Sequence, residues 1–392
     1  MAELRMKRVR IFDTTLRDGE QSPGAAMSPA ARLRIAQLLA DAGADVVEAG
    51  FPAASPAVAA SVAGIARRVK GTQIAALARC VKSDIESAAH ALRSAAAPRI
   101  HVFIATSPIH LQHKLRISMD RAIEMAVESV RFARNLCEDV EFSAEDATRT
   151  DLHVLCRMFS AVIAAGARTI NIPDTVGYAT PAEMQRLVSY VREHVGGIER
   201  ACISVHTHDD LGMATANALA SVSGGARQVE CTVNGIGERA GNCALEEVVM
   251  ALRTRADTFA AQTNFDPRAI RALSAAVARA TRMPVQKNKS IVGANAFAHE
   301  SGIHQDGVLK ERSTYEIVDC EQLGVSTNLP LGRNSGRHGV MHRAERLGLR
   351  FAGAERDRFL EAFSRLAAQR RNVADNDLLQ IAADLKSSNL HQ

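Results

Sequence analysis

The sequence predicts an α/β protein built on a closed (β/α)8 TIM barrel, followed by a mainly helical C-terminal extension. Eight short β-branched runs recur in the first two thirds of the chain, and most precede a longer Ala-, Leu- and Arg-rich segment with helical spacing. Strands that alternate with helices imply right-handed βαβ units and a parallel sheet. Eight such units over about 250 residues fit a closed barrel better than an open sheet. The runs are Val9–Phe12, Asp45–Glu48, Gln73–Leu77, Ile100–Ile104, Val140–Phe142, Thr169–Ile172, Cys202–Val205 and Gln228–Thr232.

Capping residues and a change of rhythm set the expected boundaries. Ser28-Pro29 and Thr180-Pro181 each offer an N-cap followed by proline at the first helical position, and Gly43 and Gly166 stand where helices should end. The alternation of predicted strands and helices ends near residue 256. We therefore expect a catalytic barrel over 1–256, a helical linker over 257–284 and C-terminal subdomains over 285–392. The last part should hold helices over His338–Leu347 and Ala354–Arg370 and end in a charged tail.

Composition excludes several classes of protein. Of the 392 residues, 47% are hydrophobic and 23% charged, which is too apolar for a disordered chain. No apolar stretch approaches the roughly 20 residues of a membrane helix, and the N-terminus lacks the apolar core of a signal peptide. Seven cysteines without a CxxC pair argue against a disulfide framework and suit a reducing cytoplasm. A net charge of +5 with 4% aromatic residues does not indicate nucleic-acid binding.

Polar residues gather where the predicted strands end. In a barrel of this kind the C-terminal ends of the strands form one mouth, where the chemistry takes place. Eight strands that deliver polar groups to one mouth are a stronger signal than any single motif. The clearest cases are Asp13–Asp18, Glu48, Arg79, Glu141–Glu145, Asp174-Thr175, His206–His208 and Asn234–Glu238.

Two histidines predict a metal centre at this mouth. His206 and His208 are two residues apart on a strand, so both imidazoles can face the same side. Asp18 follows the first strand and Asn242 the last, and closure of the barrel makes these strands neighbours. Two imidazoles, a carboxylate and an amide oxygen suit a divalent Mn, Fe, Co or Zn ion. The alternative, a pair of merely hydrogen-bonded histidines, is disfavoured by the Asp209-Asp210 pair beside them.

Two further side chains are candidates for catalysis. Arg17, beside Asp18, keeps its proton and can stabilise a developing oxyanion, although a lone arginine after a strand is more often part of a surface ion pair. The glycine-rich run 235–242 does not have the spacing of a nucleotide-binding loop. Glu238 within it would orient a ligand or carry a proton, or would simply be a surface carboxylate.

Eight motifs carry a resemblance that covers about residues 8–345. They are FDTTLRDGEQSPG, VVEAGFPAASP, HVFIATSPIH, EFSAEDATRTD, NIPDTVGYATP, SVHTHDDLG, NGIGERAGNCALEE and AHESGIHQDGVLK. Together they resemble the 2-isopropylmalate synthases. The wider group is the metal-dependent Claisen-condensing barrel family, which includes homocitrate, citramalate and re-citrate synthases and 3-hydroxy-3-methylglutaryl-CoA lyase. HTHDD, NGIGERAGN and SGIHQDG favour isopropylmalate synthases, whereas LGRNSGRHGV and AHESGIH also resemble the homocitrate-type members.

The resemblance implies a reaction and its rivals. Acetyl-CoA would condense with 3-methyl-2-oxobutanoate, and hydrolysis of the thioester would give 2-isopropylmalate and CoA, a step of leucine biosynthesis. Homocitrate or citramalate synthesis would use 2-oxoglutarate or pyruvate instead. A lyase that cleaves the carbon–carbon bond is disfavoured by SGIHQDG. A non-catalytic metal-binding barrel should have lost one of the residues Arg17, Asp18, His206 and His208, and all are present.

The resemblance also assigns roles to residues. Its metal ligands match Asp18, His206, His208 and Asn242, and the ion is expected to be Mn²⁺, with Mg²⁺, Co²⁺ or Zn²⁺ as alternatives. Arg17 matches the arginine that polarises the keto group. His304, with Glu238 as relay, is the expected base, and Tyr315 is expected beside it. The positions around the 2-oxo acid match Glu48, Arg79, His101, Ser143 and Thr175.

The family's C-terminal segment implies an assembly. His304 and Tyr315 fall where that segment reaches over the barrel mouth of a partner subunit, so we expect a homodimer with residues 285–392 as the lid. Long members of the family continue into a leucine-binding regulatory domain. This chain ends near the point where that domain would begin, and we expect a short form that leucine does not inhibit.

Overall fold

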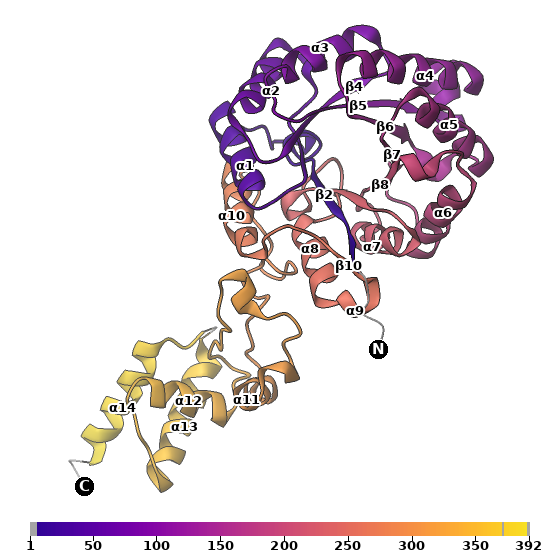
Figure 1. Ribbon diagram of the computed structural model, residues 1–392. Coiled ribbons are helices and arrows are strands. Elements are labelled where there is room, and N and C mark those ends of the chain that lie inside the picture. Colours follow the sequence, from indigo (N-terminus) through magenta and orange to yellow (C-terminus); the bar gives the residue numbers. More distant parts are fainter. Residues whose placement is uncertain (1–5, 371, 390–392) are drawn as a thin grey trace. The chain divides into compact units, whose positions relative to one another are not determined.

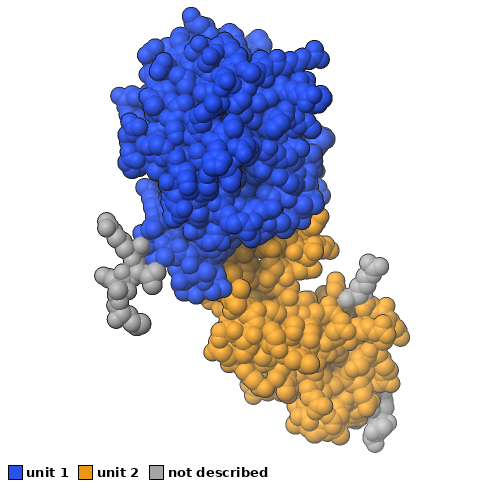
Figure 2. Space-filling model, turned by 90° about the vertical axis from the view of Figure 1, so that its right-hand side faces the viewer, with its two compact units in different colours: residues 1–285 blue, residues 286–392 orange. Residues whose placement is uncertain are grey.

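The computed structural model describes residues 6–370 and 372–389. The chain folds into two compact units, of which the first ends at Val285 and the second begins at Gln286 (Figure 2). Each unit has its own buried core, and each is described by itself.

The first unit contains a closed barrel of eight parallel strands in sequential order, ringed by helices (Figure 1). The predicted (β/α)8 fold is thereby confirmed, and every predicted run is a strand. Five strands continue beyond the predicted apolar runs into the polar residues of the mouth, because main-chain pairing does not depend on side-chain polarity. The strands are β2 (Arg10–Asp13), β3 (Val46–Glu48), β4 (Gln73–Arg79), β5 (Pro98–Ala105), β6 (Val140–Glu145), β7 (Thr169–Asp174), β8 (Cys202–Thr207) and β9 (Gln228–Cys231).

The outer helices begin and end at the expected caps. The Ser28 hydroxyl accepts a hydrogen bond from the Ala31 amide, and Thr180 forms a capping box with Glu183. Gly166 ends a helix at a positive φ of 114°, which only glycine adopts readily. The helices around the barrel are α1 (Pro29–Asp41), α2 (Pro56–Arg68), α3 (Lys82–Leu92), α4 (Met119–Leu136), α5 (Leu152–Ala165), α6 (Pro181–His194), α7 (Ala214–Gly224) and α8 (Leu245–Thr254).

The barrel interior below the mouth holds a polar layer. The Arg99 guanidinium lies 2.8 Å from Oε2 of Glu141 and 2.9 Å from Oε1 of Gln228. The amide of Gln228 donates to Glu141 and to the Ser204 hydroxyl. All four side chains are buried, and their hydrogen bonds satisfy groups that would be costly to bury alone. This layer forms a rigid floor beneath the site.

Residues 257–284 belong to the barrel unit in the structure and do not form a separate linker. The short strand β1 (Lys7–Arg8) pairs in parallel with β10 (Ala261–Gln262). Helix α10 (Ile270–Thr281) lies against α1 on the outside of the barrel (Figure 1). The segment resembled a linker in the sequence because the βα alternation ends before it.

The second unit is mainly helical, as predicted. It contains α11 (Gly302–Lys310), α12 (Arg337–Arg346), α13 (Gly353–Gln369) and α14 (Asp375–Asn389). The expected charged tail is wrong, because α14 buries Leu378, Ile381 and Ala382 against Phe359 and Phe363 of α13. Within the described residues, no helix is both long and apolar enough to cross a membrane.

Candidate metal centre and active site

One pocket of about 280 Å³ opens at the C-terminal ends of the strands. It collects side chains from all eight barrel strands or the loops that follow them, from Arg17 to Arg239 along the sequence. Closure of the barrel therefore brings most of the predicted site together. The predicted residues that line it are Arg17, Asp18, His101, Ser143, Thr175, His206, His208 and Glu238.

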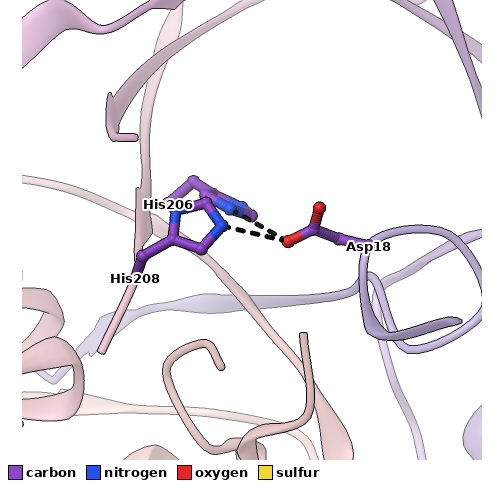
Figure 3. Close-up of side chains that lie close together, drawn as sticks. All are labelled: Asp18, His206 and His208. Carbon is purple, nitrogen blue, oxygen red and sulfur yellow. Dashed lines mark ion pairs between the residues drawn. The ribbon is translucent and has the colours of Figure 1, made fainter. Parts of the chain in front are cut away.

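Three of the expected metal ligands converge on one point. Oδ2 of Asp18 lies 3.5 Å from Nε2 of His206 and 3.3 Å from Nε2 of His208 (Figure 3). Asn242 completes the group, since its Nδ2 lies 2.5 Å from the same carboxylate oxygen. A β-bridge between His208 and Asn242 holds the loop after β9 against the end of β8. All four side chains are buried.

The donor set fits a divalent cation. One donor atom from each of Asp18, His206 and His208 lies within 4.8 Å of the others. Oδ1 of Asn242 is buried and has no hydrogen-bond partner among the described residues, which leaves an amide oxygen available as a fourth donor. Burial alone would raise the pKa of Asp18, but Arg17 and the two histidines hold it well below its ordinary value. An ionised carboxylate with two imidazoles suits the ions predicted from the sequence.

Outer contacts orient both imidazoles. Nδ1 of His206 lies 2.8 Å from Oε2 of Glu230 on β9, and Nδ1 of His208 lies 3.3 Å from the Asp174 carbonyl oxygen. Both acceptors fix Nδ1 as the protonated nitrogen and leave Nε2 free to coordinate. Glu230 was not among the residues predicted from the sequence. Its signal is the register that places it opposite His206 on the neighbouring strand.

Arg17 is held rigidly beside the metal centre. Its Nε lies 2.5 Å from Oε2 of Glu48, and its Nη1 lies 2.8 Å from Oδ1 of Asp18. Burial alone would raise the pKa of Glu48, but Arg17 and His101 lower it to about 2. The carboxylate is therefore ionised at neutral pH, and it fixes the guanidinium in one orientation.

A chain of hydrogen bonds continues from Glu48 across the pocket. Oε1 of Glu48 lies 2.8 Å from Nδ1 of His101, and Nε2 of His101 lies 2.6 Å from the Ser143 hydroxyl. The amide of Asn171 donates to the same hydroxyl at 2.8 Å. Burial alone would lower the pKa of His101, but Glu48 raises it. These hydrogen bonds connect four strands and fix three polar side chains that line the pocket.

Comparison with known proteins identifies the family. The HMGL-like family matches residues 8–277, and the homocitrate synthase post-HMGL domain-like family matches residues 291–371. The 2-isopropylmalate synthase of Rhodopirellula baltica is 52% identical over 376 residues, which is 96% of this chain and 71% of that protein. That of Syntrophus aciditrophicus is 54% identical over 95% of this chain and 72% of that protein. The chain belongs to the 2-isopropylmalate synthase family.

Solved structures of more distant relatives agree with the fold. Hydroxymethylglutaryl-CoA lyase from Pseudomonas aeruginosa is 24% identical and superposes with a TM-score of 0.62, over 72% of this chain and 96% of the lyase. The lyase from Brucella melitensis is 22% identical with a TM-score of 0.60, over 70% and 99% of the two chains. At this level of identity the likeness concerns the barrel fold alone.

Five predicted residues of this 2-isopropylmalate synthase family member do not line the pocket. Two of them, Glu48 and Asn242, are buried and hydrogen-bond to residues that do line it. Arg79 does not line it, since its guanidinium pairs with Asp84 of α3 at 2.6 Å. His304 and Tyr315 lie in the second unit, where both side chains are exposed and their ring centroids are 4.2 Å apart. Their predicted roles therefore stay predictions.

The pocket also contains residues to which the sequence analysis gave no role. Lys114 lies in a π-helical turn, His110–Leu115, and pairs with Glu145 at 2.6 Å. Four apolar residues also line the pocket, and no role was predicted for them because apolar residues in and after strands are common. They are Phe51, Leu77, Phe103 and Pro173.

Proposed function

We propose that this chain condenses acetyl-CoA with 3-methyl-2-oxobutanoate and hydrolyses the thioester, giving 2-isopropylmalate and CoA. Membership of the 2-isopropylmalate synthase family supports the reaction. The single structural observation that carries the proposal is the placement of Arg17 between Glu48 and Asp18, beside both histidines. A fixed cation next to a metal-binding group suits activation of a keto acid.

We assign Asp18, His206, His208 and Asn242 as the residues that would hold the divalent ion, with Mn²⁺ as the expected metal. When bound, such an ion supplies Lewis-acid polarisation and a template for a 2-oxo acid. Glu230 and Asp174 act through the histidines by fixing the orientation of their rings. Arg17 would donate to the keto oxygen and continue to stabilise it as negative charge develops there.

Carbon–carbon bond formation requires removal of a proton from the methyl group of acetyl-CoA. The resulting carbanion attacks the keto carbon, and the keto oxygen becomes an alkoxide that takes up a proton. Water then attacks the thioester carbonyl and releases CoA as a thiol. We assign proton removal to His304, with Glu238 as relay and Tyr315 as its neighbour. Glu238 reaches the pocket with a side chain that is half exposed.

We further propose a homodimer in which residues 285–392, with His304, form the lid on the partner's barrel. The exposed imidazole and phenol in the second unit support it, because two neighbouring polar aromatic rings at a surface suit a contact with substrate or with another chain. The substrates themselves are small molecules.

The lining of the pocket favours a branched apolar substrate. Phe51, Leu77 and Phe103 suit an isopropyl group. A 2-oxoglutarate molecule would need a cation for its second carboxylate, and Lys114 already pairs with Glu145. The match of residues 291–371 to the homocitrate synthase post-HMGL domain-like family keeps homocitrate synthesis as the second candidate.

The decisive assay measures thiol release from acetyl-CoA with 3-methyl-2-oxobutanoate, 2-oxoglutarate and pyruvate. We expect the highest kcat/KM for 3-methyl-2-oxobutanoate. A hydrophobic pocket separates acids that differ by one methylene by about 1–3 kcal/mol, or roughly 10- to 200-fold. Preference for 2-oxoglutarate would move the assignment to homocitrate synthesis. Absence of thiol release with all three acids would overturn the proposed reaction.

A further inference from the structure

Four neighbouring strands carry arginines at the end of the barrel opposite the catalytic pocket. The strands β7, β8, β9 and β2 are consecutive around the barrel. Arg168 directly precedes β7, Arg200 stands two residues before β8, Arg227 directly precedes β9, and Arg10 is the first residue of β2. The barrel order therefore converts four separated arginines into one arc.

A pocket of about 590 Å³ lies within this arc. It is distinct from the metal centre, because Cys202 at the start of β8 lines it whereas His206 near the end of β8 lines the catalytic pocket. Four residues of strand span about 13 Å. The side chains of interest in its wall are Arg8, Arg10, Arg168, Arg200, Arg227 and the carboxylates of Asp139 and Glu199.

The two carboxylates leave most of the arginines unneutralised. Asp139 pairs with Arg99, which belongs to the barrel interior, at 3.0 Å. Glu199 lies 3.7 Å from its neighbour Arg200. Among residues 6–370 and 372–389, the side chains of Arg10 and Arg168 make no hydrogen bond or ion pair.

Arg227 is the most constrained member of the arc. Its Nη1 donates to the Val222 carbonyl at 3.0 Å and also to that of Ala226, so part of the guanidinium closes the end of α7. Burial, and after it the charge of Arg192, lowers the pKa of Arg227. The cation is thus held in place at the cost of desolvation and of repulsion from Arg192, and the opposite charge of a bound anion would offset that cost.

We propose that this pocket is a second binding site, which takes a small phosphate-type oxyanion. A guanidinium matches a phosphate group through two parallel hydrogen bonds, which makes clustered arginines the usual phosphate ligand in proteins. A concave wall with one dominant sign of charge focuses its field on the pocket that it lines. No aromatic side chain lines the pocket, so it offers no platform on which nucleic-acid bases could stack.

Binding at this end should stabilise the fold without competing with substrate. Anything that binds only the folded state adds stability according to its concentration and affinity. The same four strands carry Asp174, His206, Glu230 and Asp13 nearer their C-terminal ends. An anion bound between the N-terminal ends of these strands would therefore stabilise the strands that hold the active site.

The test is isothermal titration of the full chain with inorganic phosphate and, in a second arm, with pyrophosphate. Both are run at constant ionic strength set with chloride. The test variant is Arg10→Gln/Arg168→Gln. The matched control is Arg34→Gln/Arg67→Gln, which removes the same charge from exposed positions outside the pocket. Thiol release from acetyl-CoA checks that each variant is folded.

We expect one site per chain, and affinity in the test variant reduced about tenfold or more. Affinity in the control should stay within about twofold of the wild type. Saturating 3-methyl-2-oxobutanoate should leave phosphate affinity unchanged. The proposed second site would be overturned if neither phosphate nor pyrophosphate bound. Equal affinity in the test and control variants, or displacement of phosphate by the oxo acid, would also overturn it. None of these outcomes bears on the condensation reaction.

Discussion

Nδ1 of His206 and Oε2 of Glu230 are 2.8 Å apart, across the register pair that joins β8 to β9. Glu230 is 1% exposed, and its other carboxylate oxygen has no hydrogen-bond partner among the described residues. Among the described residues, no arginine or lysine forms an ion pair with Glu230. The contact of this buried carboxylate with His206 makes Glu230 a positioning residue for the proposed metal centre.

Glu230→Gln should weaken binding of Mn²⁺ to chelator-stripped protein by about 10- to 100-fold, because the amide keeps the shape but loses the charge that makes the imidazole a stronger ligand. Calorimetric titration with the metal measures this directly, independently of turnover. Glu193→Gln, on the exposed face of α6, is the matched control. Unchanged metal affinity in Glu230→Gln would show that the contact is only structural.

His208→Ala should abolish turnover and leave the fold intact. The imidazole lies at the mouth and takes no part in the apolar core, so removal costs a ligand and little packing. Thiol release and thermal unfolding followed by circular dichroism measure the two effects. His153→Ala, at an exposed histidine of α5, is the control. Full activity in His208→Ala, or after exhaustive chelation, would contradict the metal assignment.

Arg17→Lys should lower kcat by about 10²-fold or more. An ammonium keeps the charge but lacks the planar fork that donates to Glu48 and Asp18 together, so it cannot hold one orientation toward the keto oxygen. Steady-state kinetics with saturating acetyl-CoA gives the value. Arg186→Lys on the exposed face of α6 should behave as wild type. A variant that changes only KM would assign Arg17 to substrate binding alone.

The barrel could be predicted because its signals are local and repeat. Each β-branched run contributed one strand, and proline, serine and glycine marked the helix ends. Helix α14 was missed although Leu378, Ile381 and Leu385 follow helical spacing, because Lys, Ser and Asn at its end resembled a tail. The polar composition of this segment was given more weight than the helical spacing of its apolar residues.

The metal centre could be predicted in part for a different reason. Only barrel closure was needed to bring Asp18 next to His206 and His208. Glu230 depends on strand register, and Lys114 on a π-helical turn, neither of which can be read from residue spacing. Arg79 was placed near the 2-oxo acid by the family resemblance. In the structure the carboxylate of Asp84, five residues later, holds its side chain, and its role stays a prediction.

Mixing two inactive proteins tests whether active sites are built across chains. Arg17→Ala lacks a barrel residue and His304→Ala lacks a residue of the second unit, so a mixed dimer would contain one site with both residues intact. We expect partial recovery of thiol release after subunit exchange, verified by native mass spectrometry of tagged chains. No recovery despite exchange would place His304 in its own chain's site or outside catalysis.

Asp13 makes stability depend on pH. It is fully buried on β2, where it accepts hydrogen bonds from the Thr15 amide at 3.0 Å and the Thr15 hydroxyl at 2.8 Å. Burial nevertheless raises its pKa from 3.8 to about 7, and the charges of Glu246 and Glu48 add to the effect. Between these two values the folded chain keeps a proton that the unfolded chain has lost. The contribution of Asp13 to the free energy of unfolding therefore falls as pH rises from about 4 to about 7, and is constant above.

Asp13→Asn removes this titration. A pKa difference of about 3 corresponds to about 4 kcal/mol, so the stability of the variant relative to the wild type should rise by an amount on that order between pH 4 and pH 8. Urea unfolding at each pH, followed by circular dichroism, gives the difference. Asp120→Asn, at an exposed position of α4, should show no such trend. A relative stability of Asp13→Asn that stays flat, or falls, as pH rises would mean that Asp13 is already ionised in the folded chain near pH 4.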